Sequence, residues 1–190
     1  MAGELPFGCR DCKIAPWNDT TETISTGVDV PRIRTVELNV TRDSADLEGD
    51  DVRVATHTFA KGLEGSIEAG GINPAVVAVL EGGVVTTGGT GGTAWVGYEV
   101  EGNQTEGYFA LEAQMYADDG GAMHFTAWRV KATNGPNYSF AQGEFALTQC
   151  DLAGIFDETT SPSRLYQIVQ YATVQPIDTA DIGDLTARPA

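Results

Sequence analysis

The sequence lacks an apolar run long enough to cross a membrane. Its longest apolar stretch, Pro74–Leu80, is far shorter than the roughly 20 residues that a membrane-spanning helix needs. Residues Met1–Arg10 contain neither a basic n-region nor an apolar h-region, so the sequence predicts no secretory signal there. We therefore expect no membrane partner.

Basic residues are also scarce. The chain has 11 Lys and Arg residues against 27 Asp and Glu residues, a net charge of −16, and its only lysines are Lys13, Lys61 and Lys131. Such a protein repels phosphates, which disfavours duplex-binding factors and proteins that bind anionic membranes. It is compatible with a protein that surrounds nucleic acid without binding it. Adaptation to a saline habitat is an alternative explanation of the charge.

Cysteine and histidine are too few for a metal centre of the usual kind. The three cysteines are Cys9, Cys12 and Cys150, and an odd number argues against a disulfide framework. Cys9 and Cys12 form a C-x-x-C, but zinc needs four ligands and there is no second pair. The two histidines, His57 and His124, alternate with apolar residues and indicate strand-face positions. We predict no metal ligand and no cofactor.

No catalytic signature stands out either. A G-x-S-x-G motif is absent, and paired carboxylates are too common in this chain to be informative. Glycosidases place two carboxylates across a sugar cleft with aromatic residues nearby. The aromatic residues available here are Trp95, Tyr98, Tyr108, Tyr116 and Trp128. We predict that the protein is not an enzyme, with a carbohydrate-binding or glycoside-hydrolysing β-sandwich module as the alternative.

What is present is a pattern typical of β-structure. Glycine and threonine are frequent, and Ile33–Arg42 alternates apolar and polar residues with a period of two. Further strands are predicted at Val52–Ala60, Leu63–Ala69, Ala94–Glu101, Tyr108–Tyr116, Ala122–Lys131, Tyr138–Gln149 and Leu165–Val174.

One short helix interrupts these strands. Asn73 is suited to an N-cap and Pro74 to the first helical position, while Gly82-Gly83 ends the helix. The Gly/Thr-rich stretch Val84–Thr93 that follows is expected to be a flexible loop. The segment Arg42–Asp51 is expected to be a polar loop, and it carries the acids Asp43, Asp46, Glu48, Asp50 and Asp51. A calcium site is disfavoured because the EF-hand spacing is absent.

The predicted organisation is one mainly-β domain with extended ends. Residues 1–29 form an extended N-terminal arm with a short strand near Asp11–Ile14. Residues 30–175 form a β-sandwich or curled sheet with one short flanking α-helix, and residues 176–190 form an extended acidic tail.

The order of features resembles a known family. An arm containing Gly8–Pro16 (GCRDCKIAP) precedes the strand Arg34–Val40 (RTVELNV), and an acidic segment then leads to Lys61–Gly71 (KGLEGSIEAGG) and the short helix. This order, over roughly residues 8–175, resembles the major tail proteins, or tail-tube proteins, of long-tailed bacteriophages.

The resemblance implies a structural virion protein of the phage tail, assembled in the host cytoplasm. It implies hexameric rings that stack into a tube, with the inner sheets of the subunits joined into a β-barrel around a lumen through which double-stranded DNA passes. The implied partners are further copies of the chain and other tail proteins, such as the tape measure, the terminator and the distal tail components.

Strand alternation then suggests which residues face the DNA. The polar faces of the first predicted strands carry six candidate lumen-lining residues: Glu37, Asn39, Thr41, Glu64, Ser66 and Glu68. Their opposite faces are apolar and are expected to pack on the second sheet. Arg53 and His57 are expected near this surface. The acidic loop is the first candidate for contacts with the next ring or a neighbouring subunit, and the two terminal arms are the second.

Overall fold

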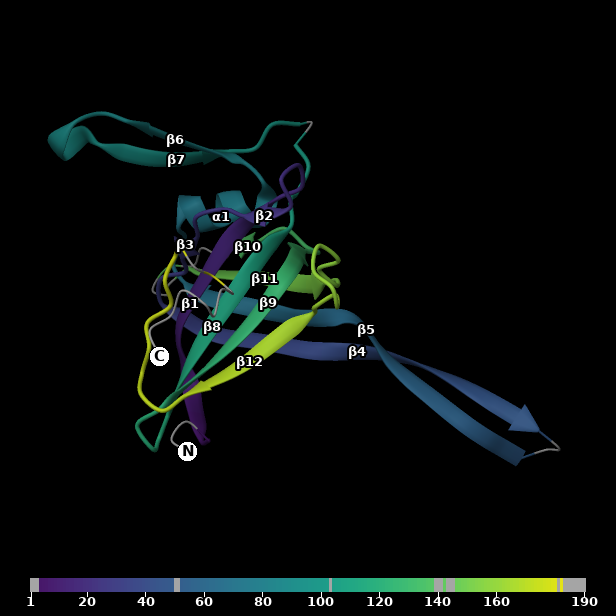
Figure 1. Cartoon of the computed structure of the whole chain (residues 1–190). Coiled ribbons are helices and arrows are strands. Elements are labelled where there is room, and N and C mark those ends of the chain that lie inside the picture. The colour runs from purple at the N-terminus through teal and green to yellow at the C-terminus, as the bar shows by residue number, and fades with distance from the viewer. Residues whose placement is uncertain are drawn as a thin grey trace.

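The computed structural model describes residues 4–49, 52–102, 104–138, 142, 146–180 and 182 (Figure 1). In chain order its elements are β1 (Pro6–Asn18), β2 (Thr23–Ile24), β3 (Val28–Asp29), β4 (Ile33–Gly49), β5 (Val52–Gly70), α1 (Pro74–Glu81), β6 (Val84–Gly88), a 3-10 turn (Gly91–Thr93), β7 (Trp95–Glu99), β8 (Phe109–Ala117), β9 (Ala122–Ala132), β10 (Asn137–Tyr138), β11 (Leu147–Gly154) and β12 (Tyr166–Tyr171). The predicted mainly-β fold with one short helix is confirmed.

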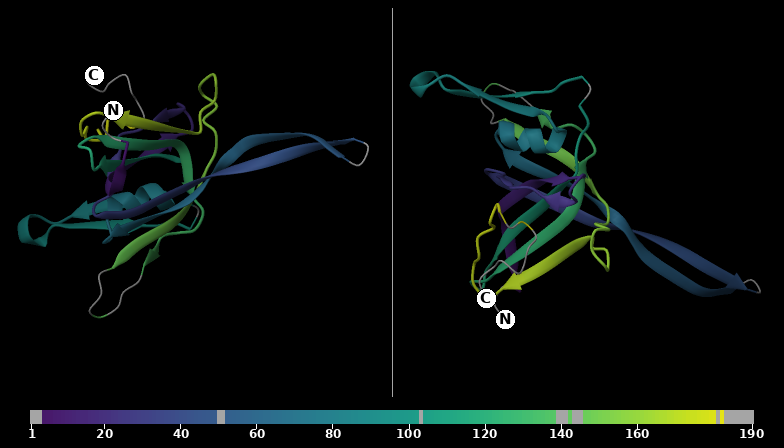
Figure 2. Two further views of the ribbon diagram at one scale, coloured as in Figure 1. Left: turned by 90° about the horizontal axis from the view of Figure 1, so that it is seen from below. Right: turned by 45° about the horizontal axis from the view of Figure 1, so that its top comes forward.

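The main sheet is antiparallel and curled. Its strand order is β2-β1-β8-β9-β11-β5-β4, with β12 paired to β9, β10 to β11 and β3 to β1. The pairing of β9 with β11 covers only residues 130–132 and 152–154, so the sheet turns a corner there. As Figure 2 shows, β11, β5 and β4 consequently cross the layer formed by β1, β8, β9 and β12.

The hydrophobic core lies between these two layers. Alternating side chains of β4 and β5 point inward, among them Val36, Leu38 and Ile67, and meet Phe109 and Leu111 of β8. Helix α1 contributes Val76 and Leu80 to the same core. The period of two in the sequence therefore separates a face packed on the core from a face turned outward.

The helix begins and ends where the sequence predicts. The side chain of Asn73 accepts a hydrogen bond from the Ala75 amide at 3.1 Å, and Pro74 occupies the first helical position. Gly82 ends the helix with φ of 78°, a conformation that favours glycine, and its amide donates to the carbonyl of Ala78.

The short strand predicted near Asp11–Ile14 within the extended arm over residues 1–29 is present, but it belongs to a longer strand of the main sheet. Residues 6–18 form β1, which pairs along most of its length with β8, and Cys12 and Ile14 are fully buried. The strand is hard to recognise because its outer face carries Asp11 and Lys13, and because Gly8 and Pro16 interrupt the apolar pattern. The face that carries Cys12 and Ile14 packs on the main core, and on the other face Ala15 packs in a second cluster with Ile177 and Ile182 of the C-terminal segment.

The predicted polar loop over Arg42–Asp51 is also corrected. Asp43, Asp46 and Glu48 lie in β4, which pairs with β5 out to Gly49 and Val52. Asp50 and Asp51 fall outside the described residues. The separate strands predicted at Val52–Ala60 and Leu63–Ala69 are one continuous strand, β5. Both faces of the outer part of β4 and β5 are exposed to solvent, so no apolar alternation marks this part as a pair of strands.

The glycine- and threonine-rich loop predicted at Val84–Thr93 contains a strand as well. Residues Val84–Gly88 form β6, which pairs with β7 in a separate two-stranded sheet closed by the 3-10 turn. At the other end of the chain, the predicted extended tail is partly packed. Ile177 and Ile182 are buried against Ala15 and Ala110 on the outer face of β1 and β8. Residues 181 and 183–190 lie outside the described part.

Candidate functional surface

The six residues predicted to share a polar surface do lie on neighbouring strands of one sheet. Asn39 is directly opposite Glu64 in the β4–β5 pairing, Glu37 is opposite Ser66, and Thr41 is opposite Gly62. Glu37, Asn39 and Glu64 are exposed, while Thr41, Ser66 and Glu68 are half-buried. Since the alternate residues of both strands belong to the core, these six face away from it. We call this set, with the two residues of β11 described next, the acidic face.

A third strand, β11, widens the acidic face. Gln149 is directly opposite Glu68, and Asp151 is opposite Ser66. Both β11 residues are exposed, whereas their neighbours Cys150 and Leu152 are buried. Sequence reasoning missed these two residues because β11 follows β5 by a long stretch of chain. The buried–exposed alternation from Thr148 to Leu152 was the available signal.

The charge of this face is negative. Arg34 lies at the edge of the acidic face and forms an ion pair with Glu68, with its Nη1 2.9 Å from Oε1 of Glu68. Asn39 donates to Glu37 at 3.4 Å. Within the described part of the chain, Glu37, Glu64 and Asp151 have no ion-pair partner. Asp151 accepts one hydrogen bond from Asn134 at 2.7 Å. Arg53 and His57, expected near this surface, lie instead on the outer part of β5.

The outer parts of β4 and β5 form a projecting hairpin, residues 42–59, that leaves the body of the protein (Figure 1). A register shift between Thr41 and Arg42 marks the point of departure. At roughly 3.3 Å per residue, the hairpin reaches about 25 Å beyond the body. Its described side chains are exposed, including the apolar Leu47 (62%) and Val54 (65%).

An isolated two-stranded hairpin is marginally stable in water, and both of its edges offer unpaired backbone groups. Two polar contacts reinforce this one: Thr56 donates to Asp46 at 2.6 Å, and Arg53 binds the same carboxylate at 3.0 Å. Exposed apolar side chains on such a projection are typical of a surface that another molecule covers.

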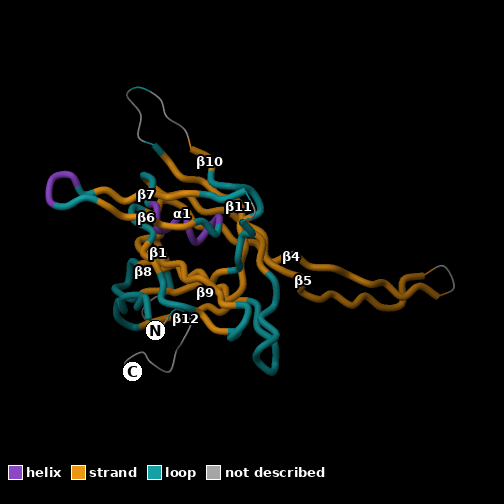
Figure 3. The backbone as a smooth tube through the Cα atoms, turned by 90° about the horizontal axis from the view of Figure 1, so that it is seen from above, coloured by secondary structure: helices purple, strands orange, loops and turns teal. Residues whose placement is uncertain are grey.

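The hairpin formed by β6 and β7 is a second projection. Figure 3 shows the two hairpins on opposite sides of the body. Residues 83–98 carry no charged side chain, and Trp95, Val96 and Val84 are exposed. The base of this hairpin is fixed by Tyr98, whose hydroxyl donates to Glu81 of α1 at 2.7 Å.

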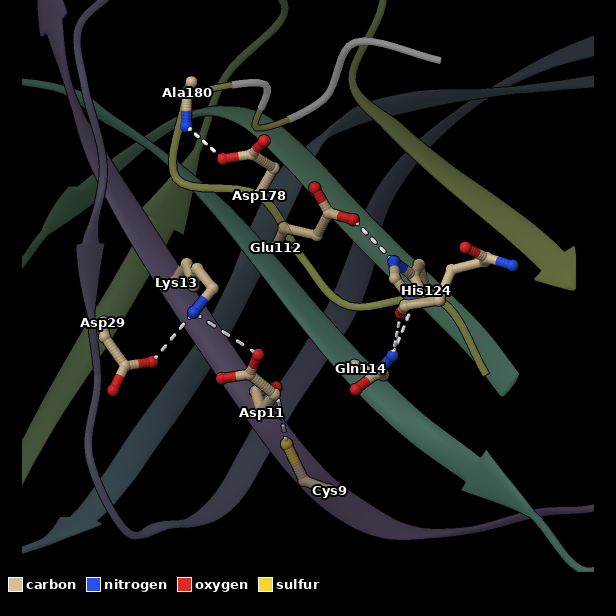
Figure 4. A network of polar contacts seen from close by, with 10 residues as sticks. Cys9, Asp11, Lys13, Asp29, Glu112, Gln114, His124, Asp178 and Ala180 are labelled. Atoms are coloured by element: carbon tan, nitrogen blue, oxygen red, sulfur yellow. Dashed lines mark hydrogen bonds and ion pairs between the residues drawn. The ribbon is translucent and has the colours of Figure 1, made fainter. Parts of the chain in front are cut away.

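A buried polar network lies between the layer formed by β1, β8, β9 and β12 and the C-terminal segment (Figure 4). His124 Nδ1 is 2.7 Å from Glu112 Oε1, and neither side chain has exposed surface. Gln114 donates to the carbonyl of Gln175, and His124 Nε2 lies 3.0 Å from the same oxygen. The hydrogen bonds to the Gln175 carbonyl hold the C-terminal segment on the sheet. Because neither side chain of the His124–Glu112 pair has exposed surface, a substrate cannot reach the pair.

Several aromatic residues considered for a carbohydrate site make contacts within the protein. Tyr98 contacts α1, Trp128 is buried beneath Arg164, and Arg129 lies over the rings of Trp17 and Tyr108.

The cysteines are free thiols. Burial raises the pKa of Cys9 to about 11 and that of Cys150 to about 12, so both are protonated at neutral pH. Burial also raises the pKa of Cys12. Within the described part of the chain, no group of three or more His, Cys, Asp or Glu side chains is placed to hold a metal ion.

Comparison with models of known protein families finds no match, and comparison with curated protein sequences finds no significant match. Among the helices of the described residues, none is long and apolar enough to span a membrane.

Proposed function

We propose that this protein is a tail-tube subunit of a long-tailed bacteriophage, assembling as stacked, hexameric rings around a lumen that conducts DNA. The observation that carries the proposal is the acidic face. Carboxylates on three adjacent strands share one side of the sheet, directly opposite the side that builds the core.

An acidic wall suits a conduit. DNA carries one negative charge per phosphate, and a surface of the same sign keeps it from adhering while it moves. Arg34, the basic residue at the edge of the acidic face, is paired with Glu68. A lumen of this kind would not bind DNA, and needs neither cofactor nor catalytic group.

Open sheet edges support assembly. Among the described strands, β4 pairs only with β5, so it ends the main sheet. An edge of this length invites pairing with another chain, and closure into a ring removes all such edges. The projecting hairpin supplies a second contact, because it extends far enough to reach a neighbouring copy.

Electron microscopy of the purified protein at high concentration and moderate salt tests the proposal. We expect hollow tubes or six-fold rings of uniform width, with the acidic face on the inner wall. Small oligomers that bind glycans on an array would contradict the tube and support the carbohydrate-binding alternative. Tubes with Glu37 and Glu64 on the outer wall would contradict the assignment of the lumen.

A further inference from the structure

A basic cleft lies at the end of the β4–β5 pair that is opposite the projecting hairpin. It has a volume of about 730 Å³ and is lined by Arg32, Arg34, Gly70, Gly71, Ala146 and Leu147. Arg32 immediately precedes β4, and Gly70 ends β5. The hairpin tip and the cleft therefore stand at the two ends of the same long pair of strands.

Arg32 is the distinctive group in this cleft. It is exposed and has φ of 56°, a left-handed conformation that is uncommon for a long side chain. The amide of Gly70 donates to the Arg32 carbonyl at 2.9 Å and holds the backbone in place. The Arg32 guanidinium extends over Gly71, where an added Cβ would lie 3.5 Å from Nη1.

The two arginines of the cleft differ in their pairing. Arg34 binds Glu68 at 2.9 Å. For Arg32, no carboxylate of the described residues is within ion-pair distance. A guanidinium presents a fixed fork of donors that suits a carboxylate, so a cleft with a free arginine fits an acidic segment.

The projecting hairpin carries a matching free acid. Asp46 is paired with Arg53, and Asp43 lies 3.9 Å from Lys61. Glu48 is exposed, and within the described chain it has no ion-pair partner. The preceding residue, Leu47, is also exposed.

We infer that the basic cleft of one copy receives the projecting hairpin of a second copy, with Glu48 bound by Arg32. Charge complementarity favours this occupant, because the chain is otherwise strongly acidic and copies repel each other over most of their surfaces. The donor and acceptor surfaces are different and lie at opposite ends of the molecule. Such a contact is heterologous and repeats from copy to copy, which builds rings or filaments.

This inference rests on the proposed function for its biological setting, since it names the surface that receives the hairpin during assembly. A charge swap tests it. We would compare the wild type with Arg32→Glu, with Glu48→Arg and with the double variant, using Glu101→Arg as a control at an exposed turn. Association is followed by sedimentation velocity, and folding by circular dichroism.

Each single variant should weaken self-association by about tenfold or more, and the double variant should recover most of the loss. The control should associate like the wild type. The inference is overturned if Arg32→Glu associates normally, if the folded double variant stays as impaired as the single ones, or if the wild type remains monomeric at millimolar concentration.

The two proposals fail in different ways. If Arg32→Glu still builds hollow tubes, the cleft is not the receiving surface, while the tube function holds. If the charge swap restores association but electron microscopy shows filaments without a lumen, the docking holds and the tube function fails.

Discussion

His124 of β9 lies with its Nδ1 2.7 Å from Oε1 of Glu112 on β8, and both side chains are completely buried. The register places His124 directly opposite Gln114, one alternate position from Glu112. The carbonyl of Gln175, only 3.0 Å from His124 Nε2, joins this pair to the C-terminal segment. The network therefore fastens residues near 175 to the outer face of the β1–β8–β9 layer.

Replacing His124 should strongly destabilise the protein. In His124→Leu, the carboxyl of Glu112 stays buried but loses its imidazole partner, and removing one member of a buried pair costs about 3–5 kcal/mol. Urea denaturation should show the loss as a lower midpoint. The double variant Glu112→Leu/His124→Leu should recover part of it, because no buried charge is left behind. A double variant less stable than His124→Leu would contradict this account of the pair.

The parts of this fold that were predictable from sequence are those whose signals are local. The helix was found because Asn73, Pro74 and Gly82 mark its ends directly. The shared face of β4 and β5 was found because a period of two survives wherever one side of a strand is buried, as Val36 and Ile67 show. Whether that face lines a lumen stays a prediction.

Features that depend on pairing between strands far apart in the sequence were missed. Asp151 joins the acidic face only because β11 pairs with β5, and β1 enters the sheet only through β8. The hairpin strands have no buried side, so their residues resemble a loop. Glu112 and His124 each fitted a strand, but only the register of β8 and β9 brings their side chains together.

Acid should remove the stabilisation that a second buried carboxylate, that of Asp157, gives to the folded protein. Burial alone would raise the pKa of Asp157, but hydrogen bonds from Thr159 and Arg164 outweigh burial and lower it. The folded state thus binds this proton more weakly than the unfolded state. The resulting stabilisation is present above the unfolded pKa of about 4 and is lost as the pH falls through the lower, folded pKa.

The variant Asp157→Asn should therefore be less stable than the wild type at neutral pH by about 1–3 kcal/mol. This difference should shrink when urea denaturation is repeated near pH 2–3. Asp118→Asn, at an exposed turn, is the control and should change little at either pH. An Asp157→Asn deficit that is equally large in acid would show that the carboxylate charge is not responsible.

Gly65 controls how closely β4 and β5 approach beneath the acidic face. A Cβ at this position would lie 3.0 Å from the Cα of Leu38 and would overlap the carbonyl of Glu37. Gly65→Ala should force the strands apart and cost about 1–3 kcal/mol in unfolding free energy. Gly107→Ala is the matched control, since nothing lies within 4 Å of the added Cβ there. Equal stabilities of the two variants would rule out this close approach.

Shortening the projecting hairpin should separate folding from assembly. Replacing residues 44–58 with Asn-Gly joins Asp43 and Phe59, which are direct partners, through a two-residue turn. The described side chains that are removed are exposed, so little burial is lost and the thermal midpoint should stay close to that of the wild type. Sedimentation and electron microscopy should show a folded protein that does not polymerise. Normal tubes from this variant would exclude the hairpin from the essential contacts.

Reversing charge on the acidic face should turn a conduit into a DNA-binding surface. The variant Glu37→Lys/Glu64→Lys changes two exposed carboxylates on adjacent strands, away from the core, so folding and assembly should persist. Its tubes should retain a fluorescent DNA duplex when pelleted at low salt and release it as salt rises, because the attraction to phosphates depends on counterion release. Glu101→Lys/Glu158→Lys adds the same charge at exposed positions outside this face. Only charges on the inner wall meet DNA within the tube. If both variants retain the duplex equally, or if neither retains it, Glu37 and Glu64 do not line the lumen.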